Sequence, residues 1–249
     1  LLKFFNLLFI YLFIFIYFIL IIYYEWIIVS LLLFNYYIFI GVWKYALRND
    51  NKEIKEYDGE IIVPFSIESP LSGVQKSLKP GMVLWYNRKI NFSKFENKGR
   101  YILNFGAVDQ ETDVYVNKIH VGHHKGGYMS FSFDITNEIL KSDNLSEIDL
   151  TIKVIDHLEK NGEAYGKQSN PRGNIKYIST GGIWQTVWIE SVPKNYIKNV
   201  KITPFYDEKK IHFKPEFLSE TKTKNNIGKY IITDKEGNKI LDELKEGGV

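Results

Sequence analysis

The sequence lacks cysteine entirely and carries only two methionines among its 249 residues. Without cysteine the chain can form neither disulfides nor thiolate metal sites, and its redox compartment stays open. Positive and negative side chains are also nearly balanced, since the formal net charge is only +3. The chain has no lysine and arginine run that would follow a phosphate backbone, so we expect no nucleic-acid partner. No amphipathic helical pattern of useful length follows residue 43, which argues against a helical domain.

Charged side chains are nearly absent from residues 1–40, where Lys3 and Glu25 are the only two. Within this hydrophobic segment, Leu7–Tyr24 is long enough to cross a bilayer as a helix, which takes about 20 residues. The apolar run is too long for a cleavable signal peptide and lacks a small-residue cleavage site. The segment is built almost only from Leu, Ile, Phe, Tyr and Asn, a composition that translated AT-rich non-coding DNA also produces. Two interpretations follow: a transmembrane anchor, which would place the protein in a membrane, or an artefact of the gene model.

From Gly41 onward the hydrophobic pattern has a period of two. Residues 129–136 alternate Met, Phe, Phe and Ile with Ser, Ser, Asp and Thr, and residues 148–154 alternate in the same way. This alternation predicts half-buried antiparallel strands. Further short strands, separated by turn residues, are predicted at 60–65, 84–90, 100–105, 112–117, 185–192 and 199–206. Many short strands at close spacing indicate an all-β sandwich or jelly roll.

Two tryptophans stand close together in the run GGIWQTVWIE (181–190). Trp184 and Trp188 are four residues apart, so both point to the same side of a strand. A sugar-stacking platform and a sandwich core both use such tryptophans. Val187 and Ile189 occupy the opposite parity, and a strand that is apolar on both faces is typical of the middle of a sandwich, so we favour the core. The core predicted from strand parity is Phe131, Phe133, Leu150, Ile152, Trp184 and Trp188.

Five segments occur in a fixed order: GVWKYAL at 41–47, IIVPFSIESPLSGV at 61–74, LWYNRKI at 84–90, residues 105–136, and GGIWQTVWIE at 181–190. Together they resemble the N-terminal sugar-binding domain of family 2 glycoside hydrolases. The resemblance implies a galactose-binding-like jelly-roll β-sandwich over 41–193. Residues 197–217 resemble the opening strands of the immunoglobulin-like β-sandwich that follows in the family, which implies a second, truncated domain over 194–249.

In this family a (β/α)8 barrel supplies the two carboxylates that hydrolyse O-glycosyl bonds, and retaining enzymes hold such a pair about 5–5.5 Å apart. The acid follows an asparagine in the family. This chain has one Asn-Glu pair, Asn137-Glu138, at the end of a predicted strand, and we interpret Glu138 as a solvated turn residue. The resemblance therefore implies a non-catalytic, sugar-binding fragment of a glycoside hydrolase in carbohydrate metabolism, inactive without the barrel domain that the chain lacks. The alternative is a membrane-tethered carbohydrate-binding or structural module with no catalytic role.

Three residues are the candidate carbohydrate contacts: Asp109, His124 and Lys176. Asp109 follows a predicted strand, where a carboxylate either orients a loop through backbone N–H groups or faces a ligand, and we favour the first role. Lys176 occupies the position, six residues before Gly182, at which several relatives place an acid that reaches the barrel. The resemblance gives His124 a packing or hydrogen-bonding role before the tight bend at 126–127.

The segment HVGHHKGGY (120–128) contains three histidines and so raises the question of a metal site. His123 and His124 are adjacent on a strand and would point apart, and neither a cysteine nor a carboxylate accompanies them. We therefore predict no metal site, and we expect no cofactor. Asn117-Lys118 stands where relatives have Asn-Gly, so Lys118 is predicted to take a positive φ at a cost of about 1 kcal/mol.

Overall fold

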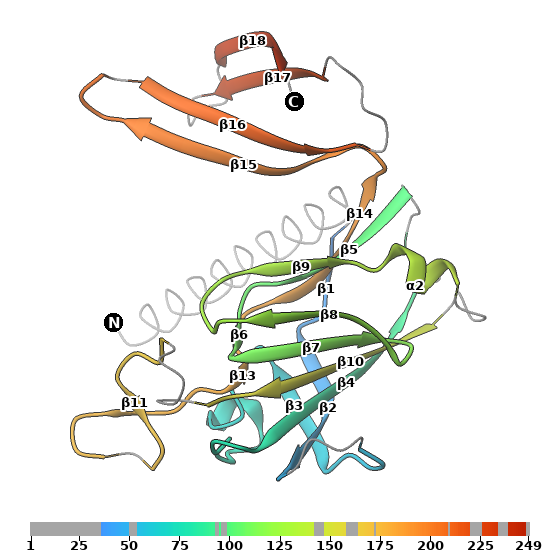
Figure 1. Ribbon diagram of the computed structural model, residues 1–249, viewed down its shortest axis with the longest axis vertical. Coiled ribbons are helices and arrows are strands. Elements are labelled where there is room, and N and C mark those ends of the chain that lie inside the picture. Colours follow the sequence, from blue (N-terminus) through green and yellow to red (C-terminus); the bar gives the residue numbers. More distant parts are fainter. Residues whose placement is uncertain are drawn as a thin grey trace, which may run out of the picture. The chain divides into compact units, whose positions relative to one another are not determined.

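The computed structural model describes residues 36–49, 54–92, 95, 99–141, 147–157, 164–171, 173–208, 210–219, 226–233 and 239–247 (Figure 1). The chain divides into two compact units, Leu1–Ser191 and Val192–Val249. Regular structure in the described residues is almost entirely β-strand, so the predicted all-β class is confirmed. The helices in this part of the chain are two short ones, η1 (Pro70–Ser72) and α2 (Thr136–Leu140).

The larger sheet of the first unit has the strand order β3-β2-β4-β10-β7-β8, and its strands lie side by side in Figure 1. These strands are β3 (Gly59–Val63), β2 (Gly41–Arg48), β4 (Val83–Asn91), β10 (Glu147–Ile155), β7 (Glu111–Val116) and β8 (Ile119–Lys125). All neighbouring strands in it are antiparallel. The hairpin between β7 and β8 turns at Asn117 and Lys118, whose φ angles are 49° and 68°, so the positive φ predicted for Lys118 is confirmed.

The smaller sheet has the strand order β1-β14-β5-β9. Its strands are β1 (Tyr36–Ile38), β14 (Val187–Pro193), β5 (Gly99–Phe105) and β9 (Phe131–Asp134). Two short ladders accompany the sheets. β6 (Val108–Asp109) pairs antiparallel with β13 (Gly182–Ile183), and β11 (Gln168–Ser169) pairs parallel with β12 (Tyr177–Ile178).

Side chains from both sheets pack into a single hydrophobic cluster, so the first unit is a β-sandwich. Leu84, Leu150 and Ile152 belong to the larger sheet, and Leu103 and Ile189 belong to the smaller one. Each of the five is 0% exposed. Leu150 and Ile152 are therefore core residues, as predicted. Burying an aliphatic side chain of this size stabilises the fold by about 1.5–3 kcal/mol.

The two tryptophans of the run at 181–190 do not belong to the fully buried core, contrary to the prediction. Trp184 and Trp188 are half-buried, whereas Val187 and Ile189 are 0% exposed. Both parities of β14 are apolar, so alternation alone does not show which parity faces inward. Branched aliphatic side chains fill the space between the sheets, while a tryptophan needs an acceptor for its indole N–H. Trp188 Nε1 finds one in Glu190 Oε1 at 2.7 Å.

Residues at the edge of the smaller sheet are also less buried than predicted. Phe131 and Phe133 on β9 are partly buried and pack against the hydrophobic cluster, because β9 has a neighbouring strand on one side only. Shortly after β9, Glu138 is half-buried in the first turn of α2, where the sequence predicted a solvated turn. A carboxylate in the first turn interacts favourably with the helix dipole.

Residues 36–40, which belong to the hydrophobic segment, take part in the sandwich. β1 pairs antiparallel with β14. Phe39 is 6% exposed, and its N–H donates to the Val187 carbonyl at 2.8 Å. Its own carbonyl accepts the indole N–H of Trp43 at 3.0 Å. The predicted transmembrane helix lies outside the described residues, and within them no helix combines the length and the apolar character needed to cross a membrane.

The second unit consists, in its described residues, of two antiparallel hairpins. β15 (Tyr196–Phe205) pairs with β16 (Lys210–Leu218), and β17 (Asn226–Thr233) pairs with β18 (Lys239–Gly247). Most side chains of β15 are exposed. The hydrophobic core clusters in the described residues are made of residues of the first unit, where the candidate site residues are also found.

Candidate functional site

Trp184 connects three segments at one end of the sandwich. Its indole Nε1 donates to the Gly127 carbonyl at 2.8 Å, which ties the residue after β13 to the bend after β8. The Tyr128 ring meets the Trp184 ring edge-on, with centroids 6.1 Å apart and planes at 70°. Gln168 on β11 donates its Nε2 to the Tyr128 hydroxyl at 3.5 Å. Trp184 is thus held in place by the backbone, while Tyr128 remains 47% exposed.

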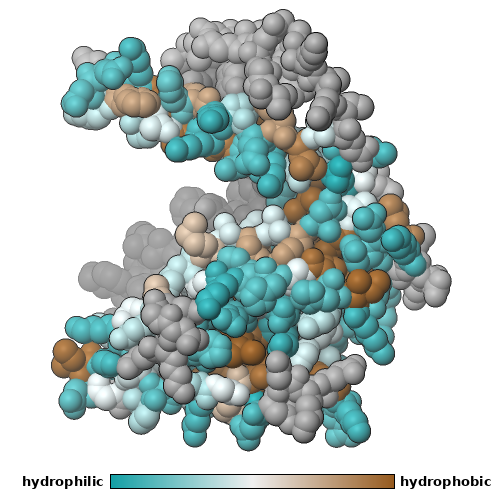
Figure 2. Space-filling view, in the orientation of Figure 1, coloured by the Kyte–Doolittle hydropathy of each residue, from teal (hydrophilic) through white to brown (hydrophobic). Residues whose placement is uncertain are grey.

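The loop that carries β11 and β12 adds two more aromatic side chains. Tyr177 on β12 is 65% exposed, and the Tyr165 ring lies 6.0 Å from the Lys176 Nζ. Figure 2 shows a mostly hydrophilic face with hydrophobic residues scattered among the polar ones. In this loop Ile175 is 76% exposed. Lys176 is half-buried and borders the Tyr165 ring. We refer to Tyr128, Tyr165, Tyr177 and Trp184 as the aromatic end.

Asp109 lies beneath the aromatic end and is 5% exposed. It ends β6, where it pairs with Gly182 of β13. The bend at Gly127 packs against it so closely that a Cβ atom on Gly127 would overlap the Asp109 carboxylate. Burial, followed by the nearby Asp109 charge, raises the pKa of Tyr128. This placement favours the loop-orienting role for Asp109 over direct contact with a ligand.

His124 packs into the sandwich edge instead of facing the aromatic end. Its ring stacks on Phe131 with centroids 3.9 Å apart and planes at 12°. Nε2 lies 3.1 Å from the Gly126 carbonyl, so the ring donates a hydrogen bond through Nε2–H. Burial is the main reason that the pKa of His124 is lowered. The ring therefore serves the bend at 126–127, as the resemblance implied.

The other two histidines of the 120–128 segment converge on Asp113. His120 Nε2 and His123 Nδ1 each lie 3.0 Å from Asp113 Oδ1, and Lys153 Nζ lies 3.1 Å from Oδ2. Burial alone would raise the pKa of Asp113, but these hydrogen bonds outweigh it and hold the pKa below its usual value. His123 and His124 point apart, as predicted. Among the described residues no group of three His, Asp or Glu side chains has the arrangement of a metal site.

Glu68 is a half-buried carboxylate that the sequence reasoning missed. Oε1 accepts the N–H of Leu78 at 2.9 Å, and Oε2 accepts the N–H of Gly181 at 3.0 Å. Burial raises the pKa of Glu68 to about 7, although these hydrogen bonds lower it, and the charge of Asp156 raises it further. The signal in the sequence was one acidic residue in the loop of the IIVPFSIESPLSGV segment, between Ile67 and a Ser-Pro pair.

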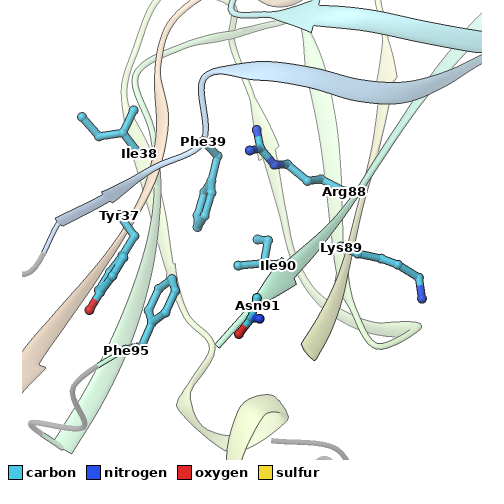
Figure 3. A pocket seen from close by; sticks show the side chains of 8 residues that line it. All are labelled: Tyr37, Ile38, Phe39, Arg88, Lys89, Ile90, Asn91 and Phe95. Carbon is cyan, nitrogen blue, oxygen red and sulfur yellow. The ribbon is translucent and has the colours of Figure 1, made fainter. Parts of the chain in front are cut away.

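A pocket of about 330 Å³ lies where β1 meets the end of β4 (Figure 3). Its lining comprises Tyr37, Ile38, Phe39, Arg88, Lys89, Ile90, Asn91 and Phe95. Tyr37 and Phe95 stack with centroids 3.5 Å apart, and Arg88 lies 5.6 Å over the Phe39 ring while its Nη1 donates to the Ile40 carbonyl at 3.2 Å. Lys89 points away from these rings in Figure 3 and pairs with Glu147 at 2.8 Å. Arg88 and Lys89 thus each already have a partner within the protein. The side chains that line the pocket mainly hold β1 against β4.

Comparison with known proteins places these residues in a family. A family model described as the sugar binding domain of glycosyl hydrolases family 2 matches residues 53–193. A β-glucuronidase of Streptococcus agalactiae serotype V is 26% identical over 222 residues, which cover 85% of this chain and 37% of that protein. A β-galactosidase of Thermoanaerobacter pseudethanolicus is 33% identical over 119 residues, which cover 47% of this chain and 15% of that protein.

A solved structure shows the same fold. The solved structure of a Parabacteroides merdae β-glucuronidase matches with a TM-score of 0.64 at 18% identity, over 86% of this chain and 30% of that one. The chain therefore spans well under half the length of these relatives. The family model covers more than half of the chain and includes Glu68, Asp109, His124, Lys176 and the aromatic end. The chain belongs to glycosyl hydrolase family 2, and the part that shows it is the sugar binding domain at residues 53–193.

Proposed function

We propose that this chain is the sugar-binding, galactose-binding-like jelly roll of a family 2 glycoside hydrolase that acts on β-glucuronides or β-galactosides. The first strands of an immunoglobulin-like domain follow it. In this role the chain binds carbohydrate and shapes the site of a catalytic barrel, and it does not itself cleave the glycosidic bond. The names of the two relatives support the substrate class, and the two packed sheets support the jelly roll.

The aromatic end is the observation that carries this proposal. The C–H faces of a sugar ring are apolar and stack on aromatic side chains, while the hydroxyl groups at the ring edge need hydrogen-bond partners. Tyr128 and Tyr177 are exposed, and Trp184 is fixed by its bond to the Gly127 carbonyl. Gln168 supplies a polar group beside these rings. This end of the sandwich therefore offers both kinds of contact.

The carboxylates near the aromatic end are unsuited to hydrolysis. A retaining glycosidase needs two carboxyl groups about 5–5.5 Å apart that both reach the glycosidic bond. Glu68 accepts two backbone hydrogen bonds, and Asp156 and Asp109 are 1% and 5% exposed. Such groups position loops and do not reach a bound sugar. Binding and support are therefore the roles that we assign to this domain.

Titration calorimetry with glucuronate-terminated and galactose-terminated oligosaccharides tests the proposal on the full chain. Trp184→Ala is expected to weaken binding about two- to tenfold, since one stacked aromatic contact contributes about 0.5–1.5 kcal/mol. Trp188→Ala is the matched control, because it removes another half-buried indole that bonds to Glu190 and lies outside the aromatic end. Equal losses in the two variants, or no binding of either sugar, would refute the assignment. Turnover of an aryl β-glucuronide would refute the non-catalytic role.

A further inference from the structure

A positive charge lies on the core-facing side of β4. Leu84, Tyr86 and Ile90 point into the sandwich and are at most 4% exposed. Arg88 has the same strand parity and is half-buried. Leu150, which lies opposite Arg88 on β10, is 0% exposed. Burying a charge costs free energy unless a partner compensates for the lost water, so an arginine at this position calls for a partner.

The partners that Arg88 has among the described residues carry no charge. Nη1 donates to the Ile40 carbonyl at 3.2 Å, and the guanidinium carbon lies 5.6 Å from the centre of the Phe39 ring and 5.7 Å from that of Trp43. Burial lowers the pKa of Arg88, yet an arginine stays charged in proteins. Within the described part of the chain, no carboxylate forms an ion pair with Arg88. A guanidinium has five N–H donors in a planar fork, and one carbonyl leaves most of them unused.

Arg88 lines the pocket of about 330 Å³ where β1 meets the end of β4 (Figure 3). The rings of Tyr37, Phe39 and Phe95 also line it, and Asn91 adds an exposed amide. Ligand sites of about 300–1,000 Å³ commonly combine apolar and aromatic walls with a few polar groups that fix the orientation of the ligand. This pocket has that combination at the small end of the range, so it suits a compact ligand with an anionic group.

The neighbouring lysine does not take the place of Arg88. Lys89 has the opposite strand parity, and its side chain points away from the aromatic rings in Figure 3. Its Nζ pairs with Glu147 at 2.8 Å. This ion pair also offsets the negative charge of Glu147, so the carboxylate at this edge of the sheet opposes an anionic ligand less. Arg88 is therefore the cation that an anion inside the pocket would meet.

We propose that this pocket binds a compact sugar acid, whose carboxylate pairs with the fork of Arg88 and whose ring lies against the aromatic walls. An arginine and a carboxylate can form two parallel charge-assisted hydrogen bonds, which neither a ring face nor a single carbonyl can supply. The C–H faces of a sugar ring are apolar and stack on aromatic rings, while its hydroxyl groups find partners in polar side chains such as Asn91. The site shares no residue with the aromatic end, so the inference goes beyond the proposed function and does not depend on it.

Nuclear magnetic resonance of the full chain measures binding at Arg88 directly. Few arginines are present, so their Nε–H signals can be resolved, and Arg88→Lys identifies the signal of Arg88. Glucuronate should shift this signal in a saturable way, whereas glucose, which has the same ring without the carboxylate, should leave it unchanged. Acetate, which has the carboxylate without the ring, should bind about two- to tenfold more weakly than glucuronate, because it lacks the aromatic contact.

Arg88→Lys should weaken glucuronate binding at least about tenfold in titration calorimetry, because lysine keeps the charge but lacks the fork. Arg48→Lys is the matched control. Arg48 ends β2 and pairs with Asp58 at 2.6 Å, and it does not line the pocket, so this variant should bind glucuronate as the parent does.

Three results would overturn the proposal: no saturable shift of the Arg88 signal by glucuronate, equal shifts by glucuronate and glucose, or equal affinity of Arg88→Lys and the parent. Acetate that binds as tightly as glucuronate would contradict the contact between the ring and the aromatic walls. If Arg88→Lys fails to fold by circular dichroism, calorimetry with glucuronate and glucose on Trp184→Ala decides, because that variant impairs the aromatic end. An intact response at Arg88 in a chain that binds no oligosaccharide would count against the proposed function alone.

Discussion

Trp43→Ala should destabilise the sandwich much more than Trp184→Ala or Trp188→Ala. Trp43 on β2 is 1% exposed, and its indole N–H donates to the Phe39 carbonyl at 3.0 Å. Its ring meets Tyr86 edge-on, with centroids 6.5 Å apart and planes at 90°. The substitution therefore removes a core ring and also the bond that holds the residue after β1.

The expected magnitudes follow from burial. Truncating a fully buried aromatic side chain to alanine costs about 3–5 kcal/mol, which includes the cavity left behind. Trp184 is half-buried, so Trp184→Ala removes about half of the transfer free energy of a buried indole together with one hydrogen bond. The free energy of unfolding should therefore fall by about 1.5–2.5 kcal/mol. We expect a gap of about 2 kcal/mol between Trp43→Ala and the other two variants.

Urea denaturation followed by far-UV circular dichroism measures these differences without relying on tryptophan fluorescence. The midpoint should fall most for Trp43→Ala while the m-value stays constant, which would indicate a change in stability alone. An equal loss in Trp184→Ala and Trp43→Ala would refute the reasoning. It would mean that Trp184 is a core residue, as strand parity had predicted.

Three further substitutions test single contacts. Gly127→Ala should cost about 1–3 kcal/mol by thermal denaturation, because its methyl group would overlap the Asp109 carboxylate, and Asp109→Ala in the same chain should recover part of the loss. Lys118→Gly should raise the free energy of unfolding by about 0.5–1 kcal/mol, seen as a higher urea midpoint, because glycine takes the φ of 68° without strain. Asp113→Asn should lower the free energy of unfolding by about 1 kcal/mol at pH 7. Because the pKa of Asp113 is lowered, its contribution exists above the unfolded-state pKa and is lost as the pH falls through the folded value, so thermal denaturation should show the difference shrinking below pH 4.

Each of these has a control in the same chain. Gly173→Ala adds a methyl group where no atom lies within 4 Å, so it should be neutral, and an equal loss would contradict the overlap at Gly127. Lys118→Ala keeps a side chain at positive φ, and a gain equal to that of Lys118→Gly would contradict the strain. For Asp113→Asn, a pH-independent difference from the parent would show that the carboxylate charge is not what stabilises the network.

Strand existence could be predicted from the sequence because the alternation of apolar and polar residues directly reflects a half-buried strand. Leu150 and Ile152 on β10 are fully buried, as their parity indicated. The same rule failed on β14, where both parities are apolar and only the packed sheets decide that Val187 faces inward and Trp188 does not. The boundary at Gly41 was placed by resemblance, and the composition of the preceding residues concealed that Phe39 packs in the core.

The candidate site was only partly accessible from the sequence. Asp109 and the bend at 126–127 stood in recognisable segments, and the structure brings them together. Glu68 could not be found in this way, because its partner Gly181 lies 113 positions further along the chain. Half-buried carboxylates of this kind have no local pattern, since their environment is created by tertiary contacts between loops.

The pairing of β1 with β14 has a consequence for how this domain can be joined to other chains. In the antiparallel register Tyr36 lies opposite Glu190, so the start of β1 and the end of β14 lie at the same end of the sandwich. If the domain is inserted into another protein, the two attachment points in that protein need to lie only slightly further apart than two neighbouring strands. The sandwich should accordingly tolerate insertion into the middle of a longer protein, and a circular permutant that links these two strands and opens at an exposed loop such as 173–176 should keep the same core.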